Sequence, residues 1–404
     1  MIYIIAYFSL FFSSIFFFLS NKKNKLYYFL NKNIYLILFF FLLFIIVIRM
    51  DTGWDYQIYR KYYDRIPDLF NLLNKKQVWN TIYFEPGFKF LMSISKTLSL
   101  NYYQFQALIG FITFIIFYSA LKRLIGYNTI YLLIYLATCF LYLNMSYIRQ
   151  GLAASIILLS FCNNKSTIKI IIGCLIATLF HFTALLFLPI LFLSRKKYSL
   201  RFILIIIITS ILIYLIKVPI LEYIIKIIEI FFKGTLTEKI YTYLNDPRFS
   251  TSRTLGIGVV EKILILSFIL TQYKNCRNKL MILFFNSYII YCLLYFLLYE
   301  VTIFFDRIRF FFLMVNGITY LIILNNIKNK VIKIVFFIFI LSFSTFSYIN
   351  TFRSEANHNI FIPYHNIFNN YDLIPINQKG WDRIRISTEI DHSLHKKKIV
   401  DANK

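Results

Sequence analysis

Charged and aromatic residues stand at the edges of long apolar runs in this chain. The stretch RMDTGWDYQIY, residues 49–59, places Arg49, Asp51, Trp54 and Asp55 directly behind such a run. Arginine forks bind phosphate oxygens in pairs, and a carboxylate or imidazole can take a proton from a hydroxyl group. Gathered in one site, residues of these types could bind a diphosphate and move a proton. Further polar residues in or beside apolar runs are Glu85 in FEPGFKF, Arg149 and Gln150 in MSYIRQGLAAS, His181 in LFHFTALLFLP, and Arg307 and Arg309 in FDRIRFF.

Each of these residues also has a purely structural interpretation. An arginine at the end of a span can extend to lipid headgroups, Arg307 can neutralise Asp306, and an aspartate can cap a loop. His181 can be a packing residue or a base near neutral pH. No second His or Cys stands near it at ligand spacing, so we expect no metal site. No Gly-rich phosphate loop is present, and we expect no cofactor.

The elements that must position these residues are membrane-spanning helices. Of the 404 residues, 59% are hydrophobic and 20% aromatic, which exceeds the apolar content of soluble domains. About twelve apolar blocks approach the ~20 residues that a helix needs to cross a bilayer. The sequence therefore predicts an all-α, polytopic integral membrane protein. The clearer blocks are 2–20, 34–48, 103–121, 128–143, 202–216, 280–299, 308–325 and 334–349, and the weaker ones are 147–162, 167–180, 182–194 and 255–272.

Short basic loops indicate the orientation in the membrane. Lys and Arg without Asp or Glu occur in the loops 21–33, 122–127, 163–169, 195–201, 273–279 and 327–333. Such loops are typical of the cytoplasmic side, and alternation over twelve spans then puts both termini and the candidate residues on the outer face. The net charge of +26 thus indicates contact with anionic membrane lipids and not with nucleic acid. One bent helix over 167–194, in place of two crossings, would put Arg307 on the cytoplasmic side, away from Arg149.

The chain divides by polarity into two parts. We expect a multispan domain over residues 1–350, with outer loops at 51–84 and 219–254, and a polar outer-face tail at 351–404. The second loop contains PILEYIIKIIEIFFKG, an amphipathic segment expected in the membrane interface. The five cysteines lie in or beside apolar segments and are expected to be packing residues.

The order of the motifs makes the chain recognisable. RMDTGWDYQIY, FEPGFKFL, MSYIRQGLAASI, FHFTALLFLPI and FDRIRFFF occur in sequence, and this series resembles the EpsG family of Wzy-type bacterial polysaccharide polymerases over roughly residues 34–325. The resemblance implies a multi-pass enzyme of the bacterial inner membrane, similar in design to the C-type lipid-dependent glycosyltransferases. Such an enzyme joins oligosaccharide repeat units carried on undecaprenyl diphosphate into O-antigen, capsule or exopolysaccharide. A flippase and a chain-length regulator of the same pathway are the further partners that it suggests.

The reaction that the resemblance implies suggests a role for each candidate residue. Arg149 first, and then Arg307 or Arg309, would bind the diphosphate and stabilise its charge as the bond to the sugar breaks. Candidates for the base that deprotonates the acceptor hydroxyl are Asp55, Asp51, Glu85 and His181, in falling order. The indole of Trp54 offers a face for a sugar ring. Arg49 near the lipid phosphates and Gln150 beside Arg149 complete the predicted substrate contacts.

Other classes of membrane protein remain open at this stage. A lipid-oligosaccharide flippase would need charges through the depth of a cavity, whereas mid-span acids are scarce here apart from Glu261. A membrane acyltransferase with His181 as base would usually need an acid nearby, and the nearest one in sequence, Glu222, is 41 residues away. A structural membrane protein would need neither a clamp nor a base.

Overall fold

The computed structural model of the protein describes residues 1–20, 25–72, 74–162, 166–220, 223, 256–299 and 302–402. The chain forms two compact units. Unit 1 consists of Met1–Leu185 and Ile334–Asp391, and unit 2 consists of Leu186–Lys333 and His392–Lys404. Most of the outer loop expected at 219–254 lies outside the described residues.

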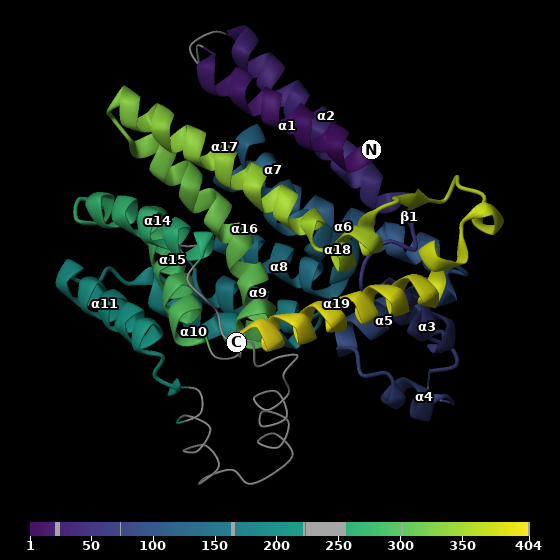
Figure 1. Ribbon diagram of the computed structural model, residues 1–404. Helices are drawn as coiled ribbons and strands as arrows, with labels where there is room; N and C mark the ends of the chain where they lie inside the picture. Colours follow the sequence, from purple (N-terminus) through teal and green to yellow (C-terminus); the bar gives the residue numbers. More distant parts are fainter. Residues whose placement is uncertain are drawn as a thin grey trace. The chain divides into compact units, whose positions relative to one another are not determined.

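Unit 1 consists almost entirely of helices (Figure 1). Helix α1 packs against α2 and α7, α6 packs against α2 and α8, and α8 packs against α9. The helices that lie wholly or mostly in this unit are α1 (Ile2–Leu19), α2 (Lys25–Val47), α3 (Tyr56–Arg65), α4 (Lys76–Thr81), α5 (Pro86–Thr97), α6 (Tyr102–Leu124), α7 (Thr129–Tyr135), the π-helix η1 (Leu136–Ser146), α8 (Ile148–Phe161), α9 (Thr167–Thr178), the 3-10 helix η2 (Phe182–Leu186), α17 (Lys330–Arg353), α18 (Glu355–Phe361), the 3-10 helices η3 (Tyr371–Leu373) and η4 (Ile376–Gln378), and α19 (Gly380–Ala402).

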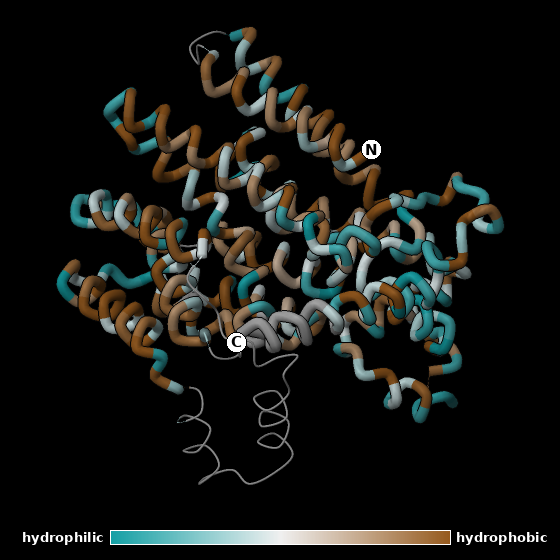
Figure 2. Tube along the Cα trace, viewed as in Figure 1, coloured by the Kyte–Doolittle hydropathy of each residue, from teal (hydrophilic) through white to brown (hydrophobic). Residues whose placement is uncertain are grey.

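A short sheet joins two distant parts of the chain. Strand β1 (Arg49–Met50) pairs antiparallel with β2 (His365–Asn366), with Arg49 opposite Asn366 and Met50 opposite His365. In Figure 2 the middle parts of α1, α2 and α17 are hydrophobic, whereas the segments around β1, α3 and residues 363–380 are largely hydrophilic. The tail that follows residue 350 is therefore folded against the stretch that begins at Arg49.

Unit 2 is centred on one helix. Helix α15 (Lys279–Leu297) packs against α10 (Phe187–Arg195), α11 (Leu200–Ile216), α14 (Ile257–Tyr273) and α16 (Thr302–Asn326). Glu261 on α14 is buried and forms an ion pair of 3.0 Å with buried Lys262. The hydroxyls of Tyr288 and Tyr320 donate to the same carboxylate. The charges in this apolar interior are thus paired, as their insertion cost requires.

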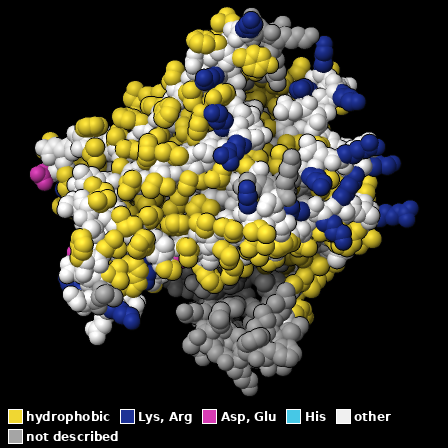
Figure 3. Space-filling model, turned by 180° about the vertical axis from the view of Figure 1, so that it is seen from behind, with side chains coloured by type: hydrophobic (Ala, Val, Ile, Leu, Met, Phe, Trp, Pro, Cys, Tyr) yellow, Lys and Arg dark blue, Asp and Glu magenta, His cyan; other side chains and the backbone are white. Residues whose placement is uncertain are grey.

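Length and hydropathy confirm the expected fold class. Among the described residues, seven helices are long and apolar enough to cross a membrane, and four further apolar helices have 10–17 residues. Many large apolar side chains, such as Phe40 and Ile205, are exposed, and hydrophobic side chains cover much of the face seen in Figure 3. Lipid is the solvent that accommodates such a surface. The chain is an all-α polytopic membrane protein, while the expected count of about twelve crossings is not confirmed.

The segment 167–194 is divided into two helices. Helix α9 ends at Thr178, the 3-10 helix η2 follows, and α10 begins at Phe187. Leu179 has an exposed side chain and an αR backbone, and its carbonyl accepts from Gly87 N at 2.9 Å. A break of this kind agrees with two short crossings and with one bent helix alike.

Two of the basic loops in each unit meet. In unit 1, the Asn31 side chain donates to the carbonyl of Tyr127 at 2.7 Å, so the loops 21–33 and 122–127 meet. In unit 2, Lys197 Nζ donates to the carbonyls of Lys274 at 3.1 Å and Cys276 at 2.8 Å, so the loops 195–201 and 273–279 meet. This grouping agrees with basic loops that share one side of the membrane.

Cysteine labelling tests the orientation. In a chain whose five native cysteines are replaced by serine, a membrane-impermeant maleimide applied to spheroplasts should label Lys76→Cys on exposed α4 and should spare Lys122→Cys in a basic loop. Both variants should react after the membrane is opened with detergent, which serves as the control. The reverse pattern would place the basic loops outside.

Candidate active site

The loop between β1 and α3 is fixed to the end of the π-helix η1. Gly53 has a φ of +113°, and a Cβ at this position would lie 1.8 Å from the carbonyl oxygen of Met145. Only glycine permits this backbone and this approach. The next residue, Trp54, donates its backbone N–H to Ser146 Oγ at 3.1 Å. The loop and the last turn of η1 therefore hold each other in place.

Arg49 also holds the loop to the end of η1. Its side chain is fully buried, and Nη1 donates to the carbonyls of Met145 and, at 3.2 Å, Thr52. A cation at the C-terminal end of a helix satisfies orphan carbonyls and favours the dipole. In this arrangement Arg49 contacts backbone and lies out of reach of a lipid phosphate.

Asp51 ties the loop to the tail. Its buried carboxylate accepts from Gln57 Nε2 at 2.6 Å and from the backbone N–H of Gly380 at 2.9 Å. Its carbonyl accepts from Arg383 Nη1 at 2.9 Å. Arg383 also donates to the carbonyls of Asn359 at 2.7 Å and Pro363 at 2.8 Å. Both Asp51 and Arg383 are thus engaged in fastening the tail to the loop.

Three candidate residues from distant segments meet around one tyrosine. The hydroxyl of Tyr59 donates to Asp55 Oδ2 at 3.3 Å and accepts from Arg149 Nε at 3.5 Å. Arg149 Nη1 forms an ion pair with Glu85 Oε2. The other oxygen of Glu85 accepts from the backbone N–H of Phe182 at 3.1 Å. Asp55, Glu85, Arg149 and the residue after His181 therefore belong to one hydrogen-bonded cluster, called here the Arg149 cluster.

Local sequence explains how these side chains are placed. Asp55 is the N-cap of α3, and Tyr59 follows four residues later on the same helix face. Glu85 is the N-cap of α5, whose first residue is Pro86. Proline suits the first helical position and a carboxylate suits the positive helix end. Arg149 lies in the first turn of α8, where the helix dipole opposes a cation, so its pairing with Glu85 compensates an unfavourable position.

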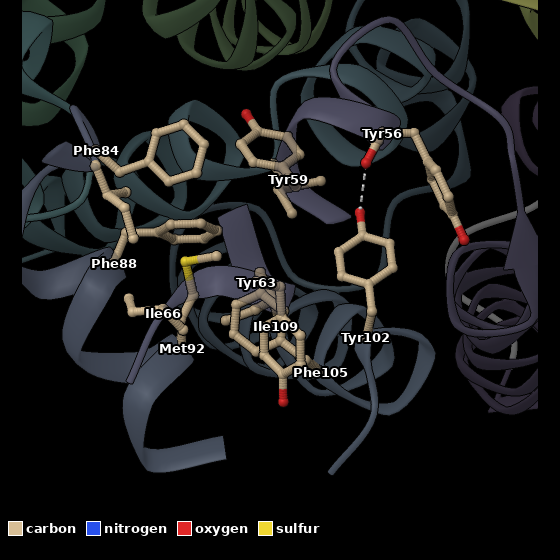
Figure 4. Close-up of a cluster of buried hydrophobic side chains, with 12 residues drawn as sticks. Tyr56, Tyr59, Tyr63, Ile66, Phe84, Phe88, Met92, Tyr102, Phe105 and Ile109 are labelled. Carbon is tan, nitrogen blue, oxygen red and sulfur yellow. Dashed lines mark hydrogen bonds between the residues drawn. The ribbon is translucent and has the colours of Figure 1, made fainter. Parts of the chain in front are cut away.

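A cluster of buried aromatic residues forms the support of the site (Figure 4). It includes Tyr59 and Phe84, together with Phe88 and Ile148. The guanidinium carbon of Arg149 lies 4.4 Å from the ring centroid of Phe84 and 5.7 Å from that of Tyr59, within the range of cation–π attraction. Burial, and then the Asp55 carboxylate, raises the pKa of Tyr59, so its hydroxyl stays protonated and keeps donating to Asp55.

Exposure divides the eight unit 1 candidates into two groups. Arg49, Asp51 and Gln150 are buried. Trp54, Asp55, Glu85, Arg149 and His181 are partly exposed, and the side chains of Arg149 and Glu85 retain 14% and 15% of their exposure. Trp54 Nε1 donates to Asn357 at 3.0 Å, and His181 Nδ1 lies 2.6 Å from Thr183 Oγ1. The second group can reach a ligand in this arrangement, whereas Arg49 and Asp51 hold the loop that carries Trp54 and Asp55.

Arg307 and Arg309 belong to unit 2. Both lie on α16, and Arg309 Nη1 is 3.3 Å from Asp306 Oδ1. The Arg149 cluster is built from residues of unit 1 alone.

Several residues of the site were absent from the sequence prediction. Tyr59 carried a usable signal, because it follows Asp55 at the helical spacing of four, and Phe84 directly precedes Glu85. Arg383 carried none, since it lies 332 residues after Asp51. Within the described residues, no three His, Cys, Asp or Glu side chains gather in a way that could hold a metal ion. That no metal is needed remains a prediction.

The comparisons identify the family. The model of the EpsG family matches residues 32–366, and the chain belongs to that family. The family is Wzy-type polymerase-like, which makes this chain a polysaccharide polymerase-like membrane protein. No curated protein and no solved structure matches the chain. The matched region contains every residue of the Arg149 cluster and ends before Arg383.

Loss of the Arg383 guanidinium should destabilise unit 1. Arg383→Ala would leave the carbonyls of Asp51, Asn359 and Pro363 without these donors, and each buried unsatisfied group costs about 1–3 kcal/mol. We expect the unfolding temperature of the detergent-purified protein to fall by several degrees. Arg385→Ala is the control, because that exposed side chain pairs only with Asp382 among the described contacts and exposed substitutions usually stay within about 0.5 kcal/mol. Equal unfolding temperatures for the two variants would contradict the fastening role.

Proposed function

We propose that this chain polymerises a bacterial surface polysaccharide by joining oligosaccharide repeat units carried on a polyprenyl diphosphate, undecaprenyl diphosphate being the expected lipid. The enzyme is a glycosyltransferase of the bacterial inner membrane that works at the outer face, and its product is an O-antigen, capsule or exopolysaccharide. Membership of the EpsG family supports the class of reaction. A flippase and a chain-length regulator are the partners that this pathway would supply.

The observation that carries the proposal is the Arg149 cluster. It combines a partly exposed guanidinium with two partly exposed carboxylates, Asp55 and Glu85, drawn from three distant segments. A cation that can bind phosphate and a carboxylate that can accept a proton are the two groups that this transfer needs.

In the proposed reaction, the growing chain on its diphosphate is the donor. The guanidinium of Arg149 binds phosphate oxygens and stabilises the negative charge that develops as the bond from the anomeric carbon to the phosphate oxygen breaks. Glu85 orients Arg149 before the substrate arrives. When the diphosphate binds to Arg149, the Glu85 carboxylate gives up its contact with the guanidinium but stays in place, because the backbone N–H of Phe182 continues to donate to its other oxygen.

Asp55 acts as the base. It takes the proton of the acceptor hydroxyl while that oxygen attacks the anomeric carbon from the side opposite the diphosphate, which inverts the configuration. Tyr59 holds the carboxylate through a hydrogen bond of 3.3 Å, and Trp54 beside it offers a face for a sugar ring. His181 becomes the second candidate base, ahead of Asp51, which is buried, and of Glu85, which is paired with Arg149. Buried Arg49 and Asp51 position the loop, and Gln150 stays a candidate substrate contact. Arg307 and Arg309 remain candidates for a second phosphate contact.

A deletion with complementation tests the function. In cells that lack the chain, lipid-linked single repeat units should accumulate at the outer leaflet and the polymer ladder on a gel should disappear. The wild-type chain should restore the ladder. Repeat units trapped at the inner leaflet would indicate a flippase, loss of a polymer substituent with an intact ladder would indicate an acyltransferase, and an unchanged glycan would refute all three activities.

A further inference from the structure

An open pocket lies along α3, the helix whose N-cap is Asp55. It has a volume of about 440 Å³, and its lining comes from α3 and from the tail around the start of α19: Gln57, Arg60, Lys61, Asp64, Arg65, Tyr371, Gly380 and Trp381. All of these residues belong to unit 1. This group is called here the α3 pocket.

The lining combines positive charge with exposed aromatic surface. Three cations, Arg60, Lys61 and Arg65, stand against one acid, Asp64. Trp381 is 50% exposed, and Lys61 Nζ lies 6.0 Å from its ring centroid. Flat aromatic faces bind the apolar faces of sugar rings, and guanidinium forks bind carboxylates. The pocket therefore offers contacts for a ligand that is both a sugar and an anion.

The pocket is built rather than incidental, because buried contacts fix its two sides. Arg60 is held over the ring of Tyr103 at 5.6 Å. Asp51 accepts from Gln57 and from Gly380 N, one residue on each side of the pocket. Burial, and then the Asp51 carboxylate, raises the pKa of Tyr371 to about 12, so its hydroxyl stays protonated near neutral pH. The position of Trp381 relative to α3 is thus set by the loop that also carries Asp55.

We propose that the α3 pocket binds a carboxylate-bearing sugar residue of the lipid-linked repeat unit. This inference rests on the proposed function and adds the substrate class, an acidic oligosaccharide. Arg60 follows Asp55 by five residues, which is about 7.5 Å along a helix axis and about 140° around it. The pocket and the base therefore lie on different faces of α3, and a repeat unit of several sugars has to extend around the helix to occupy both.

A lipid headgroup fits the pocket less well. Asp64 in the lining repels any anion, but its carboxylate is a good acceptor for the hydroxyls of a sugar ring. The exposed indole of Trp381 also has no role in binding a phosphate but a direct one in stacking on a sugar. The favoured ligand is therefore the glycan.

The first test is the composition of the repeat unit. Lipid-linked repeat units that accumulate in the deletion strain are released by mild acid and analysed for charge and mass. A carboxylate-bearing sugar is expected. A neutral repeat unit would overturn this inference and leave the polymerase assignment intact, whereas a strain that accumulates no repeat units and keeps its polymer would refute the proposed function.

The second test is binding of that oligosaccharide to the purified full-length protein in detergent. The native compound should bind at least ~10-fold more tightly than the same compound with its carboxyl groups reduced to alcohols, which corresponds to about 1.4 kcal/mol. Lys61→Gln with Arg65→Gln, and separately Trp381→Ala, should weaken the native compound to a similar degree. Lys75→Gln with Lys76→Gln on exposed α4 is the matched control and should bind like the wild type.

Three results would contradict the inference. Equal affinity for the native and reduced compounds, or normal binding by the pocket variants, would overturn the inference. If the pocket variants lost co-purified phosphatidylglycerol but bound the oligosaccharide normally, the pocket would be a lipid headgroup site and the inference would be wrong.

Discussion

Replacement of Arg149 by alanine is expected to lower the polymerisation rate at least about 100-fold, since removal of one donor to developing negative charge typically costs 10²–10³ in rate. The substitution removes the guanidinium that contacts Tyr59 and Glu85. Arg149→Lys should recover only part of the rate, because an ammonium keeps the charge but loses the paired contacts. The rate is measured with purified protein in vesicles, from the conversion of lipid-linked repeat units into a ladder.

A double substitution separates the two roles that Arg149 could have. If Arg149 only neutralised Glu85, Arg149→Ala with Glu85→Gln would regain activity. If Arg149 binds the diphosphate, the double variant stays inactive. Arg123→Ala, an exposed arginine at the end of α6, is the control and should polymerise normally at the same protein level. A single Arg149→Ala variant with near-normal rate would contradict the proposed clamp.

Asp55→Asn should be the second large loss, of about 10²–10⁴ in rate, as for other positioned proton acceptors. The amide has the size of the carboxylate, and its oxygen can still accept from Tyr59, so the fold around α3 should be retained. The proton of the acceptor hydroxyl, however, would have no acceptor at this position. The measurement is the single-turnover rate at saturating lipid-linked substrate, which separates chemistry from binding.

Two companion variants make the Asp55 result interpretable. Tyr59→Phe removes one hydrogen bond to the carboxylate and should lower the rate only several-fold, in line with about 1 kcal/mol. Asp68→Asn, in the loop after α3, should have no effect. Full activity of Asp55→Asn would contradict its role as the base. His181 would then be the base, and His181→Gln should show the loss of about 10²–10⁴ in rate.

The sequence predicted the fold class from its long apolar runs and the candidate site from the charges beside them. A charge next to a membrane span is expensive, so Asp55, Glu85 and Arg149 stand out without any knowledge of the fold. The family resemblance rested on the same stretches, and the match over residues 32–366 confirms it. The residue types alone predicted that these three side chains would gather in one site. They did not predict which of the three would be in contact.

What the sequence could not predict depends on partners far away in the chain. Arg49 and Asp51 resemble Arg149 and Asp55 in sequence context, yet they are buried, because η1 and the tail cover them. The π-helix η1 was also missed, since an unbroken apolar run does not distinguish an α-helix from a π-helix. The helices α8 and α9 are shorter than the apolar blocks that contain them, because hydropathy places the ends of helices poorly.

The hydrogen bond between Asp51 and Arg383 can form only after most of the chain has been synthesised. The site is therefore complete later than its own residues are made. Residues 49–59 and the segments that bear Glu85 and Arg149 leave the ribosome early, but the guanidinium that holds Asp51 follows 332 residues later. At about 5–20 residues per second, that delay is roughly 15 to 65 seconds. A nascent chain released before Arg383 would carry every residue of the Arg149 cluster and still lack the bond that fixes its loop, so premature termination yields an inserted but unfinished protein.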